Sequence, residues 1–179
     1  MPPPPGLDAV HAAVVYDGAA RELVARLKYR NARTAAGLLV DLVDGVLPPE
    51  VDAGAVTWVP ASRERHRGFG FEHAELLARG LARRRGVAAR RLLRRVDNGA
   101  QTRRARADRL RGPALVAGGV VPRCVIIVDD VATTGATLRN AAGALRLQGC
   151  ERVIGVVVAR TLLKGPAVGS ESPLRETPP

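Results

Sequence analysis

The segment at residues 125–137, VIIVDDVATTGAT, constrains the fold more than any other part of the chain. It opens with four β-branched aliphatic residues, a pattern that predicts a short strand buried on both faces. Asp129 and Asp130 follow where this apolar run ends, and small residues then lead into a helical pattern at residues 138–147. Ligands bind beyond the carboxyl ends of strands in an open parallel sheet, so we expect a ligand site here.

The residue types after this strand favour a phosphate. The start of a helix presents free backbone N–H groups and the positive end of the helix dipole, and both attract an anion. Thr133, Thr134 and Thr137 add hydroxyl donors, and Gly135 lets the backbone approach the ligand closely. The two carboxylates cannot bind that phosphate, so we expect them to serve something beside it, such as sugar hydroxyls or a cation.

Three familiar motifs that place acids or phosphate-binding residues after a strand do not fit this segment. Aspartates commonly cap helices or form turns, but a capping aspartate is normally adjacent to its helix, whereas this pair stands several residues upstream. A receiver domain also ends a strand with paired acids, but it places them near its beginning, and here only 49 residues follow Asp130. A P-loop is excluded, because the sequence has no G-x-x-x-x-G-K-[ST].

The predicted architecture is a single α/β domain. Its length of 179 residues suits one domain, and strands that alternate with helices predict a three-layer fold with a mostly parallel sheet flanked by helices. Strands are predicted at residues 55–59, 87–96, 120–128 and 152–159, and helices at residues 18–29, 34–42, 74–84 and 135–148. The domain is expected to span residues 12–162, with a flexible basic loop at 97–112 and disordered Pro-rich ends at residues 1–11 and 163–179.

The pattern acid-acid-x-x-[ST]-[ST]-G-x-[ST] after an aliphatic strand resembles the 5-phosphoribosyl-1-pyrophosphate (PRPP) site of the type I phosphoribosyltransferases. Further segments resemble the ComF-like, competence-associated branch of that family, in the same order along the chain. They are YDG at 16–18, LKY at 27–29, WVPAS at 58–62, RGF at 67–69, EHAELLA at 72–78, and the residues Gln101 and Arg109. The resemblance covers roughly residues 12–160 and implies the type I phosphoribosyltransferase fold.

The resemblance also implies roles for the site residues. Asp129 and Asp130, the expected catalytic residues, would bind the ribose 2′- and 3′-hydroxyls and favour positive charge on the sugar. Mg²⁺ would be held near them, mainly through oxygens of the substrate. The residues expected to bind the ribose and the 5′-phosphate are Asp129, Asp130, Val131, Ala132, Thr133, Thr134, Gly135, Ala136 and Thr137. The residues expected at the pyrophosphate are Lys28, Pro60, Ala61, Ser62 and Arg67.

Part of the pyrophosphate set also suits simpler structural roles. Pro60 fits the plain end of a strand, and Lys28 fits a helix C-terminus, where the dipole favours a cation. The family's RGFNQA-like segment is RGFGFEHAELLA here, with two residues inserted or the arginine displaced, so the role of Arg67 stays open. His66 and His73 lie beside the loop that follows the predicted strand at 55–59, and they are expected at the surface or beside the substrate.

Cysteine usage and hydropathy predict a cytoplasmic protein without membrane insertion. ComF-like chains often begin with a four-cysteine zinc module, but this sequence contains only Cys124 and Cys150, so we expect no such module. The spacing of the two cysteines matches no metal site, and both are expected to be inert thiols. The N-terminus has no signal-peptide pattern, and no apolar run approaches the ~20 residues that cross a bilayer.

The net charge of +11 is concentrated in one stretch. Residues 79–111 contain thirteen arginines and two acids, which accounts for the whole excess. Three interpretations stay open for residues 90–111: a solvated basic face, the flexible hood that this fold closes over PRPP, or a grip on a nucleic-acid backbone. No aromatic residue is interleaved with these arginines, so sequence-specific recognition is not expected.

Two functions from different classes follow from these observations. The first is a Mg²⁺-dependent phosphoribosyltransferase with PRPP and an unknown acceptor as its partners. The second is a non-catalytic accessory protein of DNA uptake or processing, which binds a nucleotide or single-stranded DNA through its arginine-rich segment and contacts DNA-uptake proteins. A homodimer is an option under either function.

Overall fold

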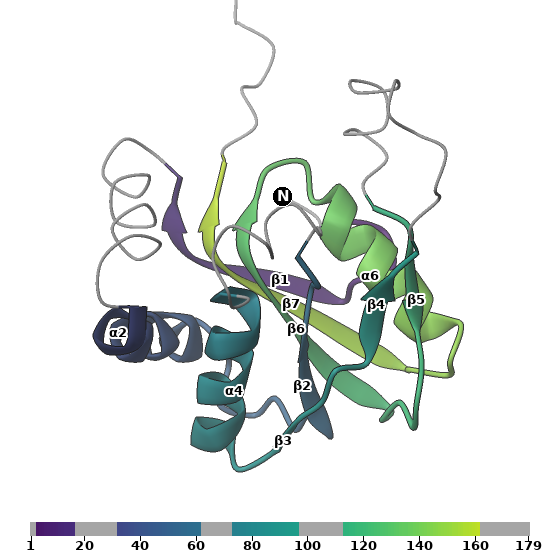
Figure 1. Cartoon of the computed structure of the whole chain (residues 1–179), viewed down its shortest axis with the longest axis horizontal. Helices are drawn as coiled ribbons and strands as arrows, with labels where there is room; N and C mark the ends of the chain where they lie inside the picture. Colours follow the sequence, from purple (N-terminus) through teal and green to yellow (C-terminus); the bar gives the residue numbers. More distant parts are fainter. Residues whose placement is uncertain (1–2, 17–31, 62–72, 97–112, 162–179) are drawn as a thin grey trace, which may run out of the picture.

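The computed structural model describes residues 3–16, 32–61, 73–96 and 113–161 (Figure 1). The predictions for Lys28, Ser62 and Arg67, for the helix at 18–29, and for the stretches 97–112 and 163–179 lie outside the described residues. The described elements are β1 (Ala9–Val15), α2 (Ala32–Gly45), β2 (Ala55–Trp58), α4 (His73–Arg85), β3 (Ala88–Ala89), β4 (Leu93–Arg95), β5 (Leu115–Ala117), β6 (Cys124–Ala132), α6 (Ala136–Arg146) and β7 (Arg152–Arg160).

Within the described residues, the central sheet has five strands in the order β1-β7-β6-β2-β3, and every neighbouring pair is parallel. β6 lies in the middle, between β7 and β2. Its residues 125–128 are fully buried, because β-branched aliphatic side chains suit a strand that is covered on both faces. The predicted fold, a mostly parallel sheet flanked by helices, is confirmed.

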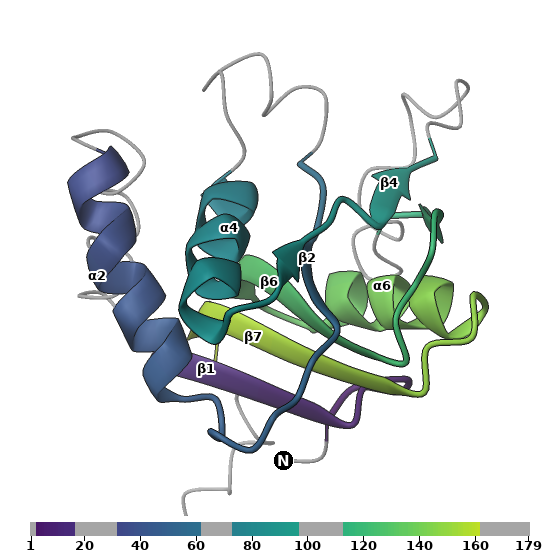
Figure 2. The same cartoon turned by 90° about the horizontal axis from the view of Figure 1, so that it is seen from below.

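Alternate side chains of β6 enter two separate cores. Ile126 and Val128 belong to the core beneath α2 and α4, whereas Val125 and Ile127 belong to the core beneath α6. β4 and β5 pair with each other as an antiparallel ribbon, which lies on the α6 side (Figures 1 and 2). In the described ranges no helix is long and apolar enough to span a bilayer.

The helices α2 and α4 pack closely on the first face. A Cβ atom added to Gly80 would lie 2.4 Å from Cγ2 of Val40, so this contact requires glycine at position 80. Arg85, at the end of α4, donates from Nε to Oδ1 of Asp44 (2.5 Å) and from Nη1 to the carbonyl of Pro48 (3.0 Å). These bonds fasten the helix pair to the loop that leads into β2.

Residues 87–96, predicted as one strand, instead form two short strands in different sheets. β3 pairs with β2 in the main sheet, whereas β4 belongs to the ribbon. Between them the N–H of Arg90 donates to the carbonyl of Val56 (2.9 Å), and the N–H of Leu92 donates to Oγ1 of Thr57 (3.3 Å). Because these partners lie on β2, far away in the sequence, no local pattern indicates where the strand breaks.

The N-terminal residues also differ from the prediction that residues 1–11 are disordered. Leu7 is buried in the core beneath α6, and residues 9–11 belong to β1, which pairs with β7. Oδ2 of Asp8 accepts from Nη2 of Arg146 (2.6 Å) and from the N–H of Val153 (2.7 Å). The folded part of the chain therefore includes residues 7–11, held by α6 and by β7.

Candidate functional site

The acid pair lies within the last residues of β6. The strand continues to Ala132 rather than ending at residue 128, and Asp129 stands opposite Val157 of β7 in the parallel register. Thr161 donates through both its N–H (3.0 Å) and its hydroxyl (3.2 Å) to the carbonyl of Ala132, which anchors the end of β6. The carboxylates are therefore carried by a paired strand in the centre of the sheet, which gives them a rigid base.

Backbone hydrogen bonds orient both carboxylates, which are half-buried. Oδ1 of Asp129 accepts from the N–H of Asp130 (2.8 Å), and Oδ1 of Asp130 accepts from the N–H of Val131 (2.8 Å). The end of β6 thus presents two adjacent, pre-oriented hydrogen-bond acceptors.

A three-residue turn, residues 133–135, joins β6 to α6. Thr133 and Thr134 are exposed, and Oγ1 of Thr134 accepts from the N–H of Ala136 (3.3 Å). Gly135 has φ +71°, a left-handed conformation that a residue with a Cβ rarely adopts, and its carbonyl accepts the helical bond from the N–H of Arg139 (2.9 Å). The first N–H groups of α6 therefore face the same edge of the sheet as the acid pair, as an anion site requires.

The N-terminal segment contacts one side of this turn. A Cβ atom on Gly135 would lie 2.8 Å from Cγ of Pro4, so glycine is required here by packing as well as by its backbone conformation. The turn is not covered by this contact, because Thr133 and Thr134 remain exposed.

The loop after β2 begins beside the acid pair. Trp58 stands opposite Val128 in the parallel register, and the N–H of Val59 donates to the carbonyl of Val128 (3.1 Å). Pro60, which is buried, and Ala61, which is half-buried, follow at the same sheet edge as Asp129. The structure thus places the predicted residues Pro60 and Ala61 at the same sheet edge as the predicted residues 129–137.

Two residues that the sequence did not single out connect the β4–β5 ribbon to this edge. Nε of Arg95 donates to the carbonyl of Pro60 (2.7 Å), and Nδ2 of Asn140 on α6 donates to the carbonyl of Pro113 (2.9 Å). Arg95 is one of thirteen arginines in residues 79–111, and no sequence signal distinguishes it from its neighbours. Its hydrogen bond to Pro60 is visible only in the folded chain.

The described residues contain no group of three or more His, Cys, Asp and Glu side chains that would hold a metal by themselves. Two adjacent carboxylates nevertheless suit Mg²⁺, which commonly takes one or two carboxylates together with phosphate oxygens of a substrate and waters. Cys124 is half-buried and Cys150 is buried, and burial raises the pKa of both thiols. Because raised pKa values disfavour the thiolate, both cysteines suit a structural role.

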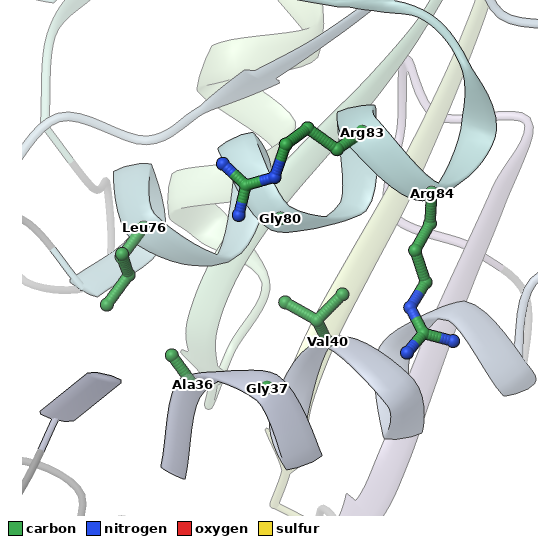
Figure 3. A pocket seen from close by; sticks show the side chains of 7 residues that line it. All are labelled: Ala36, Gly37, Val40, Leu76, Gly80, Arg83 and Arg84. Carbon is green, nitrogen blue, oxygen red and sulfur yellow. The ribbon is translucent and has the colours of Figure 1, made fainter. Parts of the chain in front are cut away.

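A separate cavity of about 550 Å³ lies between α2 and α4, on the opposite face of the sheet from α6 (Figure 3). Its lining combines small and apolar residues with two arginines and contains none of the predicted site residues: Ala36, Gly37, Val40, Leu76, Gly80, Arg83 and Arg84. Arg84 pairs with Asp41 of α2 at its rim.

Comparisons with known proteins agree with this arrangement. The model of the phosphoribosyl transferase domain family matches residues 69–168, more than half of the chain. The structure resembles a solved structure described as the allosteric regulatory enzyme of purine biosynthesis, with a TM-score of 0.54 and 24% sequence identity. That match covers 77% of this chain but 30% of the other, and at this identity it supports the fold alone. A comparison with curated protein sequences gave no match.

The fold and the β6–α6 junction together define an α/β protein of the type I phosphoribosyltransferase kind. The chain belongs to the phosphoribosyl transferase domain family. The resemblance seen in the sequence is confirmed at this level.

Proposed function

We propose that the chain is a type I phosphoribosyltransferase of the ComF-like branch, which binds PRPP and transfers its 5-phosphoribosyl group to an acceptor. The observation that carries this proposal is the junction of β6 and α6, where two half-buried carboxylates precede a three-residue turn into a helix. A ligand that satisfies both parts carries vicinal hydroxyls and an anionic group in one molecule, as a ribose 5-phosphate does.

In this proposal Asp129 and Asp130 accept hydrogen bonds from the ribose 2′- and 3′-hydroxyls and act as the catalytic residues. Their charge favours the positive charge that develops on the sugar as the bond from the anomeric carbon to pyrophosphate breaks. Their backbone hydrogen bonds orient them before the ligand binds, which reduces the cost of positioning. The backbone N–H groups of residues 133–137 and the threonine hydroxyls hold the 5′-phosphate.

The pyrophosphate is assigned to the loop after β2. Pro60 and Ala61 begin this loop beside Asp129, which supports the assignment. Ser62, Lys28 and Arg67 complete the proposed set from the family resemblance. Mg²⁺ near the acid pair would bind mainly through substrate oxygens and would neutralise charge on the departing pyrophosphate.

Thermal denaturation with PRPP and Mg²⁺ tests the proposal. A ligand at ~100 times its dissociation constant stabilises the folded state by about 2.7 kcal/mol, which corresponds to a rise in Tm of roughly 5–10 °C for a domain of this size. We expect this rise in the wild type and its near loss in Asp130→Asn and Thr134→Val. Asp52→Asn is the matched control, because this exposed carboxylate precedes β2 at the opposite sheet edge, and it should keep the full rise. No rise at millimolar PRPP in the wild type would refute the proposal.

A second candidate function is a ComF-like accessory protein that binds single-stranded DNA through residues 90–111. The observation that favours it is the exposure of Arg94 in β4 and of Arg90 and Arg91 just before it. Retention on single-stranded DNA should then weaken steeply with salt and should fall in the variant Arg90→Ala/Arg91→Ala/Arg94→Ala, because each neutralised phosphate adds salt-dependent affinity. Unchanged retention in this variant would remove the accessory role.

A further inference from the structure

The β4–β5 ribbon is fastened to both loops of the candidate site. At the end of β4, Nε of Arg95 donates to the carbonyl of Pro60 (2.7 Å) in the loop after β2. Just before β5, the carbonyl of Pro113 accepts from Nδ2 of Asn140 (2.9 Å), one turn after the start of α6. The N–H of Val96 donates to the carbonyl of Ala114 (3.0 Å), so these two attachment points are also joined to each other. The ribbon therefore bridges the loop after β2 and the helix that carries the phosphate turn.

The bond from Arg95 fixes one peptide plane of the loop after β2. The carbonyl of Pro60 and the N–H of Ala61 belong to the same planar trans peptide unit, so they point in opposite directions. A donor that holds the carbonyl on the ribbon side therefore directs the N–H of Ala61 away from the ribbon. The ring of Pro60 also restricts φ at this residue, which leaves the peptide fewer alternative orientations.

The charge and burial of Arg95 make this bond a strong restraint. Its guanidinium is a charged donor, the carbonyl that it contacts belongs to a buried residue, and the bond is part-buried. Charged donors form shorter and stronger hydrogen bonds than neutral ones, and partial burial reduces the competition from water. The orientation of the Pro60–Ala61 peptide is thus set by a residue 35 positions away in the chain.

We propose that Arg95 is a positioning residue that orients the Pro60–Ala61 peptide, so that the N–H of Ala61 donates to the pyrophosphate group of the substrate. This inference rests on the proposed function, because it assumes that a diphosphate lies against the loop after β2. Arg95 acts through the peptide and does not itself contact the ligand.

Calorimetric titration of the full chain with two probes separates this inference from the function on which it rests. Ribose 5-phosphate reports on the acid pair and the phosphate turn, and pyrophosphate with Mg²⁺ reports on the loop after β2. We expect Arg95→Met to weaken pyrophosphate binding about tenfold, or about 1.4 kcal/mol, and to change ribose 5-phosphate binding less than twofold. Arg95→Lys should recover part of the loss, because its ammonium can donate to the same carbonyl.

A direct charge contact predicts a different result from a positioning role. If Arg95 bound pyrophosphate itself, Arg95→Met would lower the salt dependence of pyrophosphate binding; a positioning residue leaves that dependence unchanged. Arg123→Met is the control for losing one arginine, because Arg123 is exposed and pairs with Glu151. Wild-type pyrophosphate affinity in Arg95→Met would overturn the inference alone. A wild type that binds ribose 5-phosphate but not pyrophosphate would overturn the inference together with the assignment of the pyrophosphate to the loop after β2, and would leave the assignment of the acid pair and the phosphate turn in place. A wild type that binds neither probe would overturn the proposed function.

Discussion

The two faces of the central sheet are built differently. In the described part of the chain, the face under α2 and α4 is covered by two helices that pack against each other, over a core that includes Trp58, Leu77 and Leu81. The face under α6 is covered by that helix, four of whose six buried residues are alanines, together with the ribbon and the N-terminal segment. The predicted site residues at the β6–α6 junction adjoin the second face, whereas the cavity between α2 and α4 belongs to the first.

This difference indicates that the two faces of the sheet have different structural roles. Small residues let α6 lie close to the sheet, so that its first turn is held against the end of β6. The N-terminal segment and the ribbon fasten the same helix at Arg146 and Asn140. We infer that the first face serves chiefly to stabilise the fold, whereas the second face also positions the loops of the candidate site.

The largest expected effect comes from removing one buried leucine on each face. Leu81→Ala and Leu138→Ala should each lower the free energy of unfolding by about 2–5 kcal/mol, because both side chains are almost fully buried. Only Leu138→Ala, one turn from Gly135, should also weaken ribose 5-phosphate binding. Urea denaturation gives the stabilities, and titration below the unfolding range gives the affinities. Equal loss of affinity in both variants would contradict the division between the faces.

A smaller effect is expected from two glycines of the first face. Gly80→Ala should lower the stability by about 1–2 kcal/mol, because its Cβ would lie 2.4 Å from Val40 and overpacking outweighs the gain in helix propensity. Gly37→Ala in α2 is the matched variant: its Cβ would meet no atom within 4 Å, so it should raise the stability by about 0.5–1 kcal/mol. Chemical denaturation of both variants measures the difference, and a stabilising Gly80→Ala would show that the helix contact is looser than described.

The smallest effect concerns Cys150, beneath α6. Its thiol lies 3.4 Å and 3.3 Å from the carbonyl oxygens of Arg123 and Arg152, and burial raises its pKa. The unfolded chain therefore releases this proton at a lower pH than the folded chain, so stability should fall as pH rises above the ordinary thiol pKa of about 8.5. Comparing the unfolding free energies of the wild type and Cys150→Ala between pH 7 and 10 measures this loss. Parallel pH curves for the two proteins would show that the thiol does not contribute.

The sequence predicts the elements that carry strong local patterns. The existence of the central strand and of the helices α4 and α6 agrees with the structure, because period and β-branching are local signals. The predicted end of β6 is wrong, since the strand continues through Asp129 and Asp130 by pairing with β7. The strand continues past the apolar run only because β7 pairs with it, and β7 lies too far along the chain for the local pattern at residues 125–130 to indicate this pairing.

The missed features all depend on partners far away in the chain. Residues 87–96 divide between two sheets because Arg90 and Leu92 bond to β2, and β1 is ordered because it pairs with β7. A Pro-rich beginning is typical of disorder, yet Asp8 is held by Arg146, 138 positions later. The predictions for Lys28, Ser62 and Arg67 concern residues outside the described ranges and stay predictions.

Thirteen consecutive residues were enough to predict the candidate ligand site at this sheet edge, because a strand, two acids and a glycine turn into a helix interact mainly with one another. Only the tertiary structure decided which other groups reach that edge. Hydrogen bonds such as Arg95 to Pro60, and packing such as Pro4 on Gly135, form after distant segments have been brought together. The strength of these contacts depends on distances and angles between segments far apart in the chain, which cannot be read from the order of residues.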